Sequence, residues 1–205
     1  MVENAPHPDF VTGFNSLEQN LHDNFLKYLK DGQIPQIKNN IFLEIYNFVQ
    51  HWANKDAEAE HLYSFFKKII NDYSTAFLNQ LNGKPSNEII DFFIELSGRM
   101  DILINFMVKS FGFIDFYYLK FTKRPCLIET AHEIYKRVFF LPSKEKVTTE
   151  LNKLLKEEED GKKENKEKIE KVNNIIKIMD FTHPKLVKEK GNFVWYDEIP
   201  KDKEG

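Results

Sequence analysis

The sequence predicts an all-α protein in which amphipathic helices pack as a multi-helix bundle. Apolar residues recur at spacings of three and four along most of the chain, which is the period of an α-helix. Prolines, glycines and N-capping residues divide this pattern into stretches of helix length. Alternation of apolar and polar residues is confined to a few residues near 192–196. These observations favour a helical bundle over a sheet fold.

The N-terminal part predicts a flexible lead-in followed by two helices. Residues 1–13 contain two prolines and a glycine, and we expect them to form a flexible N-terminus. The first helix is expected to begin at Ser16, as its N-cap, and to end near Gly32. The second is expected after Pro35, over residues 37–53.

The middle of the chain predicts two long helices. The third is expected over residues 56–82 and ends at a turn over residues 83–85. The fourth covers residues 87–121, and Gly98 and Gly112 inside it lower its helix propensity. We therefore expect this helix to bend near one of the two glycines.

The C-terminal part predicts three shorter helices. Pro125 can open a fifth helix that closes near Pro142. Ser143 can start a sixth helix that ends at Gly161, and a last helix is expected over residues 165–180.

The helical pattern also predicts the domain limits. We expect one bundle over residues 14–182 and a C-terminal tail, residues 183–205, with a short apolar run. Hydrophobic residues make up 41% of the 205 residues and charged residues 30%, which suits a folded domain with a sizeable core.

Charge and cysteine content argue against several classes of protein. Lys and Arg number 29 against 32 Asp and Glu, so the net charge of −3 gives no general attraction to nucleic acid or to an anionic membrane. Cys126 is the only cysteine, which rules out an internal disulfide and a cysteine-rich zinc module. No signal-like segment starts the chain, and no run approaches the roughly 18 apolar residues of a membrane span. We expect a soluble protein of the cytoplasm, the nucleus or both.

A metal centre is one candidate chemistry. Two Glu-x-x-His spacings place a carboxylate and an imidazole on one helix face, as in di-metal bundles: Glu58 with His61, and Glu129 with His132. Glu18 and Glu95 could supply the single glutamates of such a site. The apolar stripe of the fifth helix turns its pair toward the flank, and the other pair lies in a charged first turn, where an acid complements the helix dipole. We therefore expect no metal and no cofactor, and keep a di-metal oxidase as a remote alternative.

A thiol nucleophile is a second candidate. Cys126 and His132 are six residues apart on one helix and so lie on roughly opposite faces, and no third group that would orient the histidine is evident. A small buried or half-buried cysteine explains the residue more simply. We expect no catalytic residue, and hence no enzyme.

The helix over residues 37–53 is more apolar than one buried face requires. Five residues at helical spacing form its core stripe: Ile41, Ile45, Phe48, Val49 and Trp52. Phe42, Leu43 and Tyr46 form a neighbouring stripe where water would be expected. A helix at the edge of a bundle buries one face in its own core, so the second stripe predicts a surface for a partner protein.

Further aromatic residues lie near the end of the fourth helix. Phe113 and Tyr118 are accompanied there by Phe111, Phe116 and Tyr117. Such groups are more often core than interface, but together with the second stripe of residues 37–53 they exceed the needs of one core.

Several segments resemble the N-terminal repeat of the cullin family. "IFLEIYNFVQHW", followed by "HLYSFFKKIINDY", is similar to a cullin helix with an aromatic-x-Glu-Leu-Tyr-x-x-Val pattern and the Leu-Tyr helix after it. The matching residues are Phe42, Glu44, Ile45, Tyr46, Val49, Leu62 and Tyr63. "FGFIDFYYL" is similar to the cullin aromatic-Leu/Met-Asp-x-x-Tyr segment, and "LNKLLKEEEDG" with "IEKVNNIIKIM" resembles the helices that follow. The order and spacing agree over about residues 14–180.

The chain departs from the cullin pattern at three positions. Ser97 stands where cullins usually carry a tryptophan, which implies different core packing in the fourth helix. Glu159 replaces an arginine, and Gln50 takes a place that often holds an aromatic residue.

The resemblance implies a five-helix bundle with short C-terminal helices that acts as a scaffold in an E3 ubiquitin-ligase complex. In that family two helices hold an adaptor with a BTB/POZ-type fold, which is a Skp-type protein with its F-box partner, an elongin C or a BTB protein. The residues that the resemblance assigns to this partner surface are Phe42, Leu43, Tyr46, Val49, Gln50, Phe113, Asp115 and Tyr118. The alternative is a helical interaction or tethering subunit outside the family.

Overall fold

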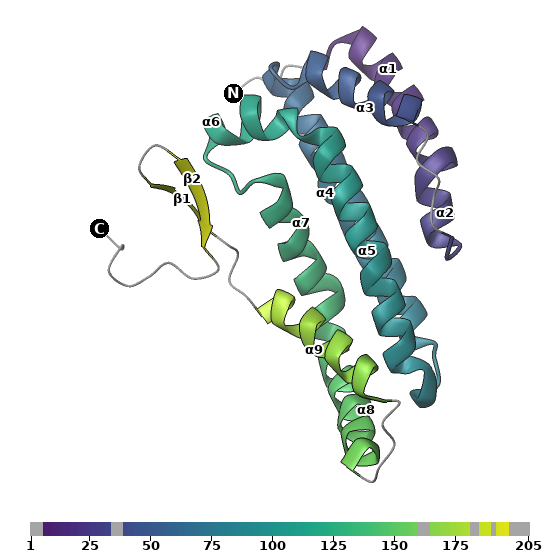
Figure 1. Cartoon of the computed structure of the whole chain (residues 1–205). Helices are drawn as coiled ribbons and strands as arrows, with labels where there is room; N and C mark the ends of the chain where they lie inside the picture. Colours follow the sequence, from purple (N-terminus) through teal and green to yellow (C-terminus); the bar gives the residue numbers. More distant parts are fainter. Residues whose placement is uncertain (1–5, 34–38, 160–164, 181–184, 190–191, 197–205) are drawn as a thin grey trace.

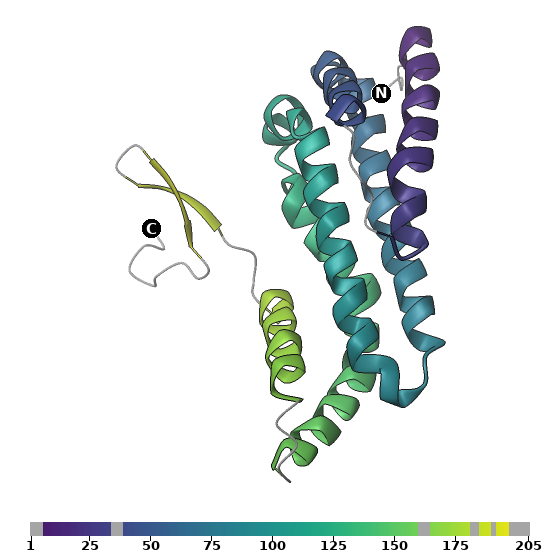
Figure 2. The ribbon, with the colours of Figure 1, turned by 45° about the vertical axis from the view of Figure 1, so that its right-hand side comes forward.

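The protein is a helical bundle built around one long pair of helices, as the sequence predicts (Figure 1). The computed structural model describes residues 6–33, 39–159, 165–180, 185–189 and 192–196. The central pair is α4 (Asp56–Asn82) and α5 (Ile89–Phe111), which lie side by side. α1 (Pro8–Leu21) and α3 (Asn39–Trp52) pack on one side of this pair, and α7 (Leu127–Tyr135) packs on the other (Figures 1 and 2).

The first helix begins earlier than the sequence predicts. α1 starts at Pro8 and not after Ser16, so the expected flexible N-terminal segment is helical from Pro8 onward. His7 caps the first turn through its ring nitrogen, and Phe10 is fully buried, which fixes this turn on the core. The helix continues through two short elements, a π-helical turn (His22–Leu26) and α2 (Lys27–Lys30).

α3 buries the stripe that its pattern predicts. Its buried residues recur at helical spacing: Ile41, Ile45, Val49 and Trp52. Phe48 is partly buried and turns its ring toward α1, where Gly13 leaves room, since a Cβ at Gly13 would lie 2.6 Å from Phe48 Cε2. The two helices therefore pack closely along this line.

The long fourth helix of the prediction bends at Gly112 and passes Gly98 without a break. The segments Ser86–Phe111 and Asp115–Thr122 are inclined by 64° to each other. Ile114, between them, is fully buried, so the bend folds the chain over the end of the core. Three short elements flank α5: a 3₁₀ turn (Ser86–Glu88), a π-helical turn (Asp115–Leu119) and α6 (Lys120–Thr122).

The break expected near Pro142 does not occur. The chain stays helical from α7 through a π-helical turn (Lys136–Phe140) into α8 (Leu141–Glu159). In a regular α-helix the ring of Pro142 would clash with the carbonyl four residues earlier, and the wider turn just before it accommodates the proline.

The C-terminal part adds one helix and a hairpin. α9 (Lys166–Asp180) packs on α5 and buries Val172 completely. The short apolar run of the predicted tail forms β2 (Asn192–Tyr196), which pairs with β1 (Lys185–Glu189) in an antiparallel hairpin. The other residues of the predicted tail lie outside the described residues.

A buried hydrogen bond joins α5 and α7 at the position where the sequence predicts unusual packing. Ser97 is buried, and the hydroxyl of Tyr135 donates a hydrogen bond to Ser97 Oγ at 3.0 Å. The Tyr135 ring is almost fully buried and fills the space beside this small residue.

Ser97→Ala should leave the Tyr135 hydroxyl without this partner in the core, which we expect to cost about 1–3 kcal/mol of unfolding free energy. Adding Tyr135→Phe removes the second polar group, so the double variant should be more stable than Ser97→Ala alone. Urea denaturation of the unchanged protein, the Ser97→Ala and Tyr135→Phe single variants and the double variant measures both effects. A double variant that loses the sum of the two single losses would show that the two hydroxyls are not coupled.

Candidate functional site

The outer side of α3 carries the apolar stripe that the sequence predicts. Leu43 is 51% exposed, while Phe42 and Tyr46 are partly buried. Phe42 packs its ring edge-on against Phe106 of α5, with 6.2 Å between ring centroids. One side of the stripe therefore packs on the core, and the other side is exposed to solvent.

The bend at Gly112 brings a second aromatic segment beside this stripe. The ring centroids of Tyr46 and Phe113 are 4.9 Å apart, although the residues belong to different helices. Phe42 stacks on Tyr46 at 5.8 Å, and Phe113 stacks on Tyr117 at 5.9 Å. These four residues form a continuous line of rings, which we call the aromatic row.

Exposed aromatic residues extend the aromatic row beyond the bend. Phe116 is 69% exposed, Tyr117 50% and Phe121 75%. We call the aromatic row, together with Leu43, Gln50, Phe116 and Phe121, the docking surface. Large exposed apolar patches usually mark sites of interaction, with another protein, a membrane or a ligand.

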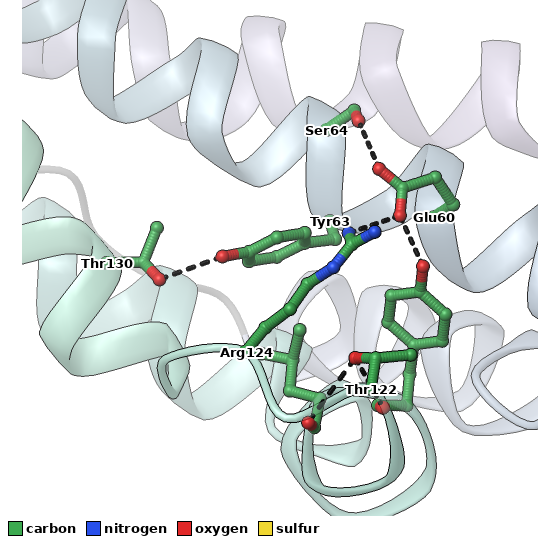
Figure 3. Close-up of polar contacts among 8 residues, drawn as sticks. Glu60, Tyr63, Ser64, Thr122, Arg124 and Thr130 are labelled. Atoms are coloured by element: carbon green, nitrogen blue, oxygen red, sulfur yellow. Dashed lines mark hydrogen bonds and ion pairs between the residues drawn. The ribbon is translucent and has the colours of Figure 1, made fainter.

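Tyr118 faces the opposite way and is only 6% exposed. Its hydroxyl donates a hydrogen bond to the carboxylate of Glu60 on α4. Glu60 also accepts a hydrogen bond from Arg124 and a longer one, at 3.4 Å, from Ser64 (Figure 3). The side chain of Tyr118 therefore lies away from the exposed rings, and it fixes the segment after Gly112 (residues 113–124, the bent segment) to α4.

The ring of Tyr63 extends this polar cluster toward α7. The hydroxyls of Tyr63 and Thr130 are hydrogen-bonded at 3.0 Å in a buried position (Figure 3). The guanidinium of Arg124 lies 5.7 Å from the ring centroid of Tyr63 and 5.3 Å from that of Tyr118. Side chains from α4, α7 and the bent segment thus hold one another in place.

The electrostatics of the cluster follow from these contacts. Burial, and then the hydrogen bond to Glu60, raises the pKa of the Tyr118 hydroxyl to about 12, so it stays a donor. Burial alone would raise the pKa of Glu60, but the hydrogen bonds from Tyr118 and Arg124 outweigh it and hold this pKa below its usual value. The carboxylate is therefore charged at neutral pH.

Asp115 also serves the fold. Its Oδ1 accepts a hydrogen bond from the backbone N–H of Leu127 at 2.8 Å, which caps the first turn of α7 from outside that helix. Burial raises the pKa of the Asp115 carboxyl, and the bond from Leu127 opposes this only in part. In this arrangement Asp115 serves α7, and its predicted role as a polar contact to a partner stays a prediction.

Val49 also lies away from the exposed part of the predicted site. It is fully buried in the stripe of α3 that faces the core, so a partner cannot reach it while the bundle is folded. Phe42, Leu43, Tyr46, Gln50 and Phe113 stay on the docking surface.

Sequence reasoning missed Phe116, Tyr117 and Phe121 as members of the site. Tyr117 could have been found, because it stands four residues after Phe113 and so lies on the same helix face. The π-helical turn shifts the register here, so that Tyr118 turns inward and Tyr117 outward.

The metal and thiol alternatives find no support in the geometry of the described residues. No three His, Cys, Asp or Glu side chains are grouped there so that they could hold a metal ion. Glu58 accepts a hydrogen bond from the backbone N–H of His7 at 2.9 Å, and Glu129 accepts one from that of Cys126 at 3.0 Å. Burial raises the pKa of the Cys126 thiol to about 11, the opposite of what a nucleophile needs.

Asp115→Asn should remove the buried charge and keep an oxygen that can accept from Leu127 N–H, so we expect no loss of unfolding free energy at neutral pH. Burial raises the folded pKa of Asp115 above its usual value, so ionisation of this carboxyl lowers stability as the pH rises through that pKa, and the Asn variant lacks this effect. Asp115→Ala removes the acceptor and should cost about 1 kcal/mol. Urea denaturation between about pH 4 and pH 7 distinguishes them. Equal losses in both variants would contradict the capping role.

Comparison with known proteins finds no family model, no curated protein and no solved structure that matches this chain. Among the described residues, no single helix has the length and apolar content to cross a membrane. In the part of the chain that the structure describes, the criteria of length and apolar content are met only by two segments taken together across a bend, Ser86–Phe111 and Asp115–Thr122.

Proposed function

We propose that this chain is a scaffold domain without catalytic residues of its own and that it binds another protein through the docking surface. The observation that carries this proposal is the aromatic row, which joins α3 to the segment beyond Gly112 and continues into exposed rings. Aromatic residues held rigidly at a surface are typical anchors of protein interfaces. The cluster around Glu60 supports the same function, because it keeps the exposed rings in a fixed position.

The partner that we propose is an adaptor with a BTB/POZ-type fold, within a cullin-like ubiquitin-ligase complex. This identity rests on the resemblance of residues 41–50 and 111–119 to the adaptor-binding segments of cullins, and both segments contribute rings to the aromatic row. The domain would act by position, holding a substrate bound to the adaptor close to the transfer machinery, in the cytoplasm or the nucleus.

Tyr117→Ala and Phe116→Ala should each weaken adaptor binding by about 2 kcal/mol or more, which is roughly 30-fold, because each removes an exposed ring of the docking surface. Titration calorimetry against a Skp-type protein with its F-box partner, an elongin C and a BTB protein measures the affinities. Thermal unfolding of each variant checks that the bundle is intact.

Leu141→Ala is the matched control for this experiment. Leu141 is an apolar residue of similar exposure to Tyr117, but it belongs to α8, away from α3 and α6 (Figure 1). We expect its affinity to equal that of the unchanged chain. An adaptor that binds the two ring variants with full affinity would refute the docking surface, and the absence of binding to all three adaptors would refute the proposed class of partner.

A further inference from the structure

We propose that the partner presents acidic side chains around the apolar pockets that receive the aromatic rings, so that its contact surface is negatively charged. This inference rests on the proposed function and goes beyond it by stating the chemistry of the partner. Its basis is the distribution of charge around the docking surface, which differs from that of the whole chain.

The α3 side of the docking surface carries amides and a histidine. The exposed residues that share the outer stripe of α3 with Leu43 are Asn40, Asn47, Gln50 and His51. Glu44 is also exposed, but it lines a recess with Gly13 and Ser16 of α1 and so lies on the other flank of α3. Among the described residues, the outer stripe of α3 therefore contains no Asp or Glu.

The side formed by the bent segment carries cations. Lys120 follows Tyr117 by three residues and Phe116 by four, which places it beside both rings. Lys109 is exposed in the last turn of α5, four residues before Phe113, and Lys123 lies in the exposed turn after α6, in a left-handed conformation with φ 54°. No carboxylate of the described residues forms an ion pair with any of these three lysines.

Two carboxylates of this region already form contacts within the fold. Asp115 is half-buried and accepts from Leu127 N–H, and Glu60 accepts from Tyr118 and Arg124. In the chain as a whole acids outnumber bases, 32 to 29, so a surface with three exposed lysines that form no ion pair with the described residues is a local departure. Charge complementarity then favours a partner of opposite sign.

The features of the surface favour a protein over an anionic membrane. A lysine near an anionic bilayer contributes only about 1 kcal/mol, so three of them give weak attachment. The aromatic row is held rigidly by ring stacking, and the amides of Asn47 and Gln50 offer donors and acceptors for the polar groups of a protein. The experiment must therefore also be able to detect binding to a membrane.

The test measures association and dissociation rates by surface plasmon resonance, at several salt concentrations, with each adaptor that binds in calorimetry. The variant is Lys120→Glu with Lys123→Glu, and the control is Lys156→Glu with Lys177→Glu. The control lysines are exposed on α8 and α9 and undergo the same change in charge. Charges at the rim of an interface act mainly on the rate of encounter, so we expect the variant to associate about tenfold more slowly at low salt. The control should match the unchanged chain.

Three other outcomes would overturn the inference. If the variant and the unchanged chain associate equally fast at all salt concentrations while the ring variants lose binding, the partner surface is not acidic, although the proposed function stands. If no adaptor binds, the proposed function fails and this inference fails with it. If the unchanged chain sediments with phosphatidylserine vesicles and the lysine variant does not, a membrane is the better occupant.

Discussion

The arrangement of the docking surface depends on the carboxylate of Glu60. This carboxylate accepts hydrogen bonds from Tyr118 and Arg124 and so fastens the chain beyond Gly112 to α4. With Tyr118 held inward, its sequence neighbour Tyr117 must point outward, and Phe113 comes to lie against Tyr46 of α3. A polar contact on one side of the bent segment thereby determines which rings face water on the other.

The energetics of the docking surface explain why a partner should be expected there. The core already contains rings from α1, α3, α4, α5 and the segment after α7, so Phe116, Tyr117 and Phe121 are not needed to complete it. Covering an aromatic side chain removes up to roughly 150–250 Å² from water, and at about 25 cal/mol per Å² this amounts to a few kcal/mol per ring before the costs of association. The free protein lacks that stabilisation because these rings stay in water, and a bound protein that covers them would provide it.

The helices could be predicted from the sequence more fully than the site. The stripe of Ile41, Ile45 and Val49 identified the buried face of α3, because helical period and burial agree there. The start of α1 was missed because the prolines and glycine of residues 1–13 suggest a loop, whereas burial of Phe10 stabilises a helix. The outward position of Tyr117 follows from its spacing to Phe113, but the inward turn of Tyr118 could not be predicted, because it depends on the contacts of the π-helical turn with α4.

The central claim is that Tyr117 faces water while Tyr118 is sealed against α4, and hydroxyl-radical footprinting with mass spectrometry tests it most directly. Radicals in solution modify exposed rings, and these two tyrosines are adjacent in the chain and chemically identical, so they serve as each other's control. The structure predicts rapid modification of Tyr117, Phe116 and Phe121 and slow modification of Tyr118. Rapid modification of Tyr118, or protection of Tyr117 in the free protein, would contradict the account.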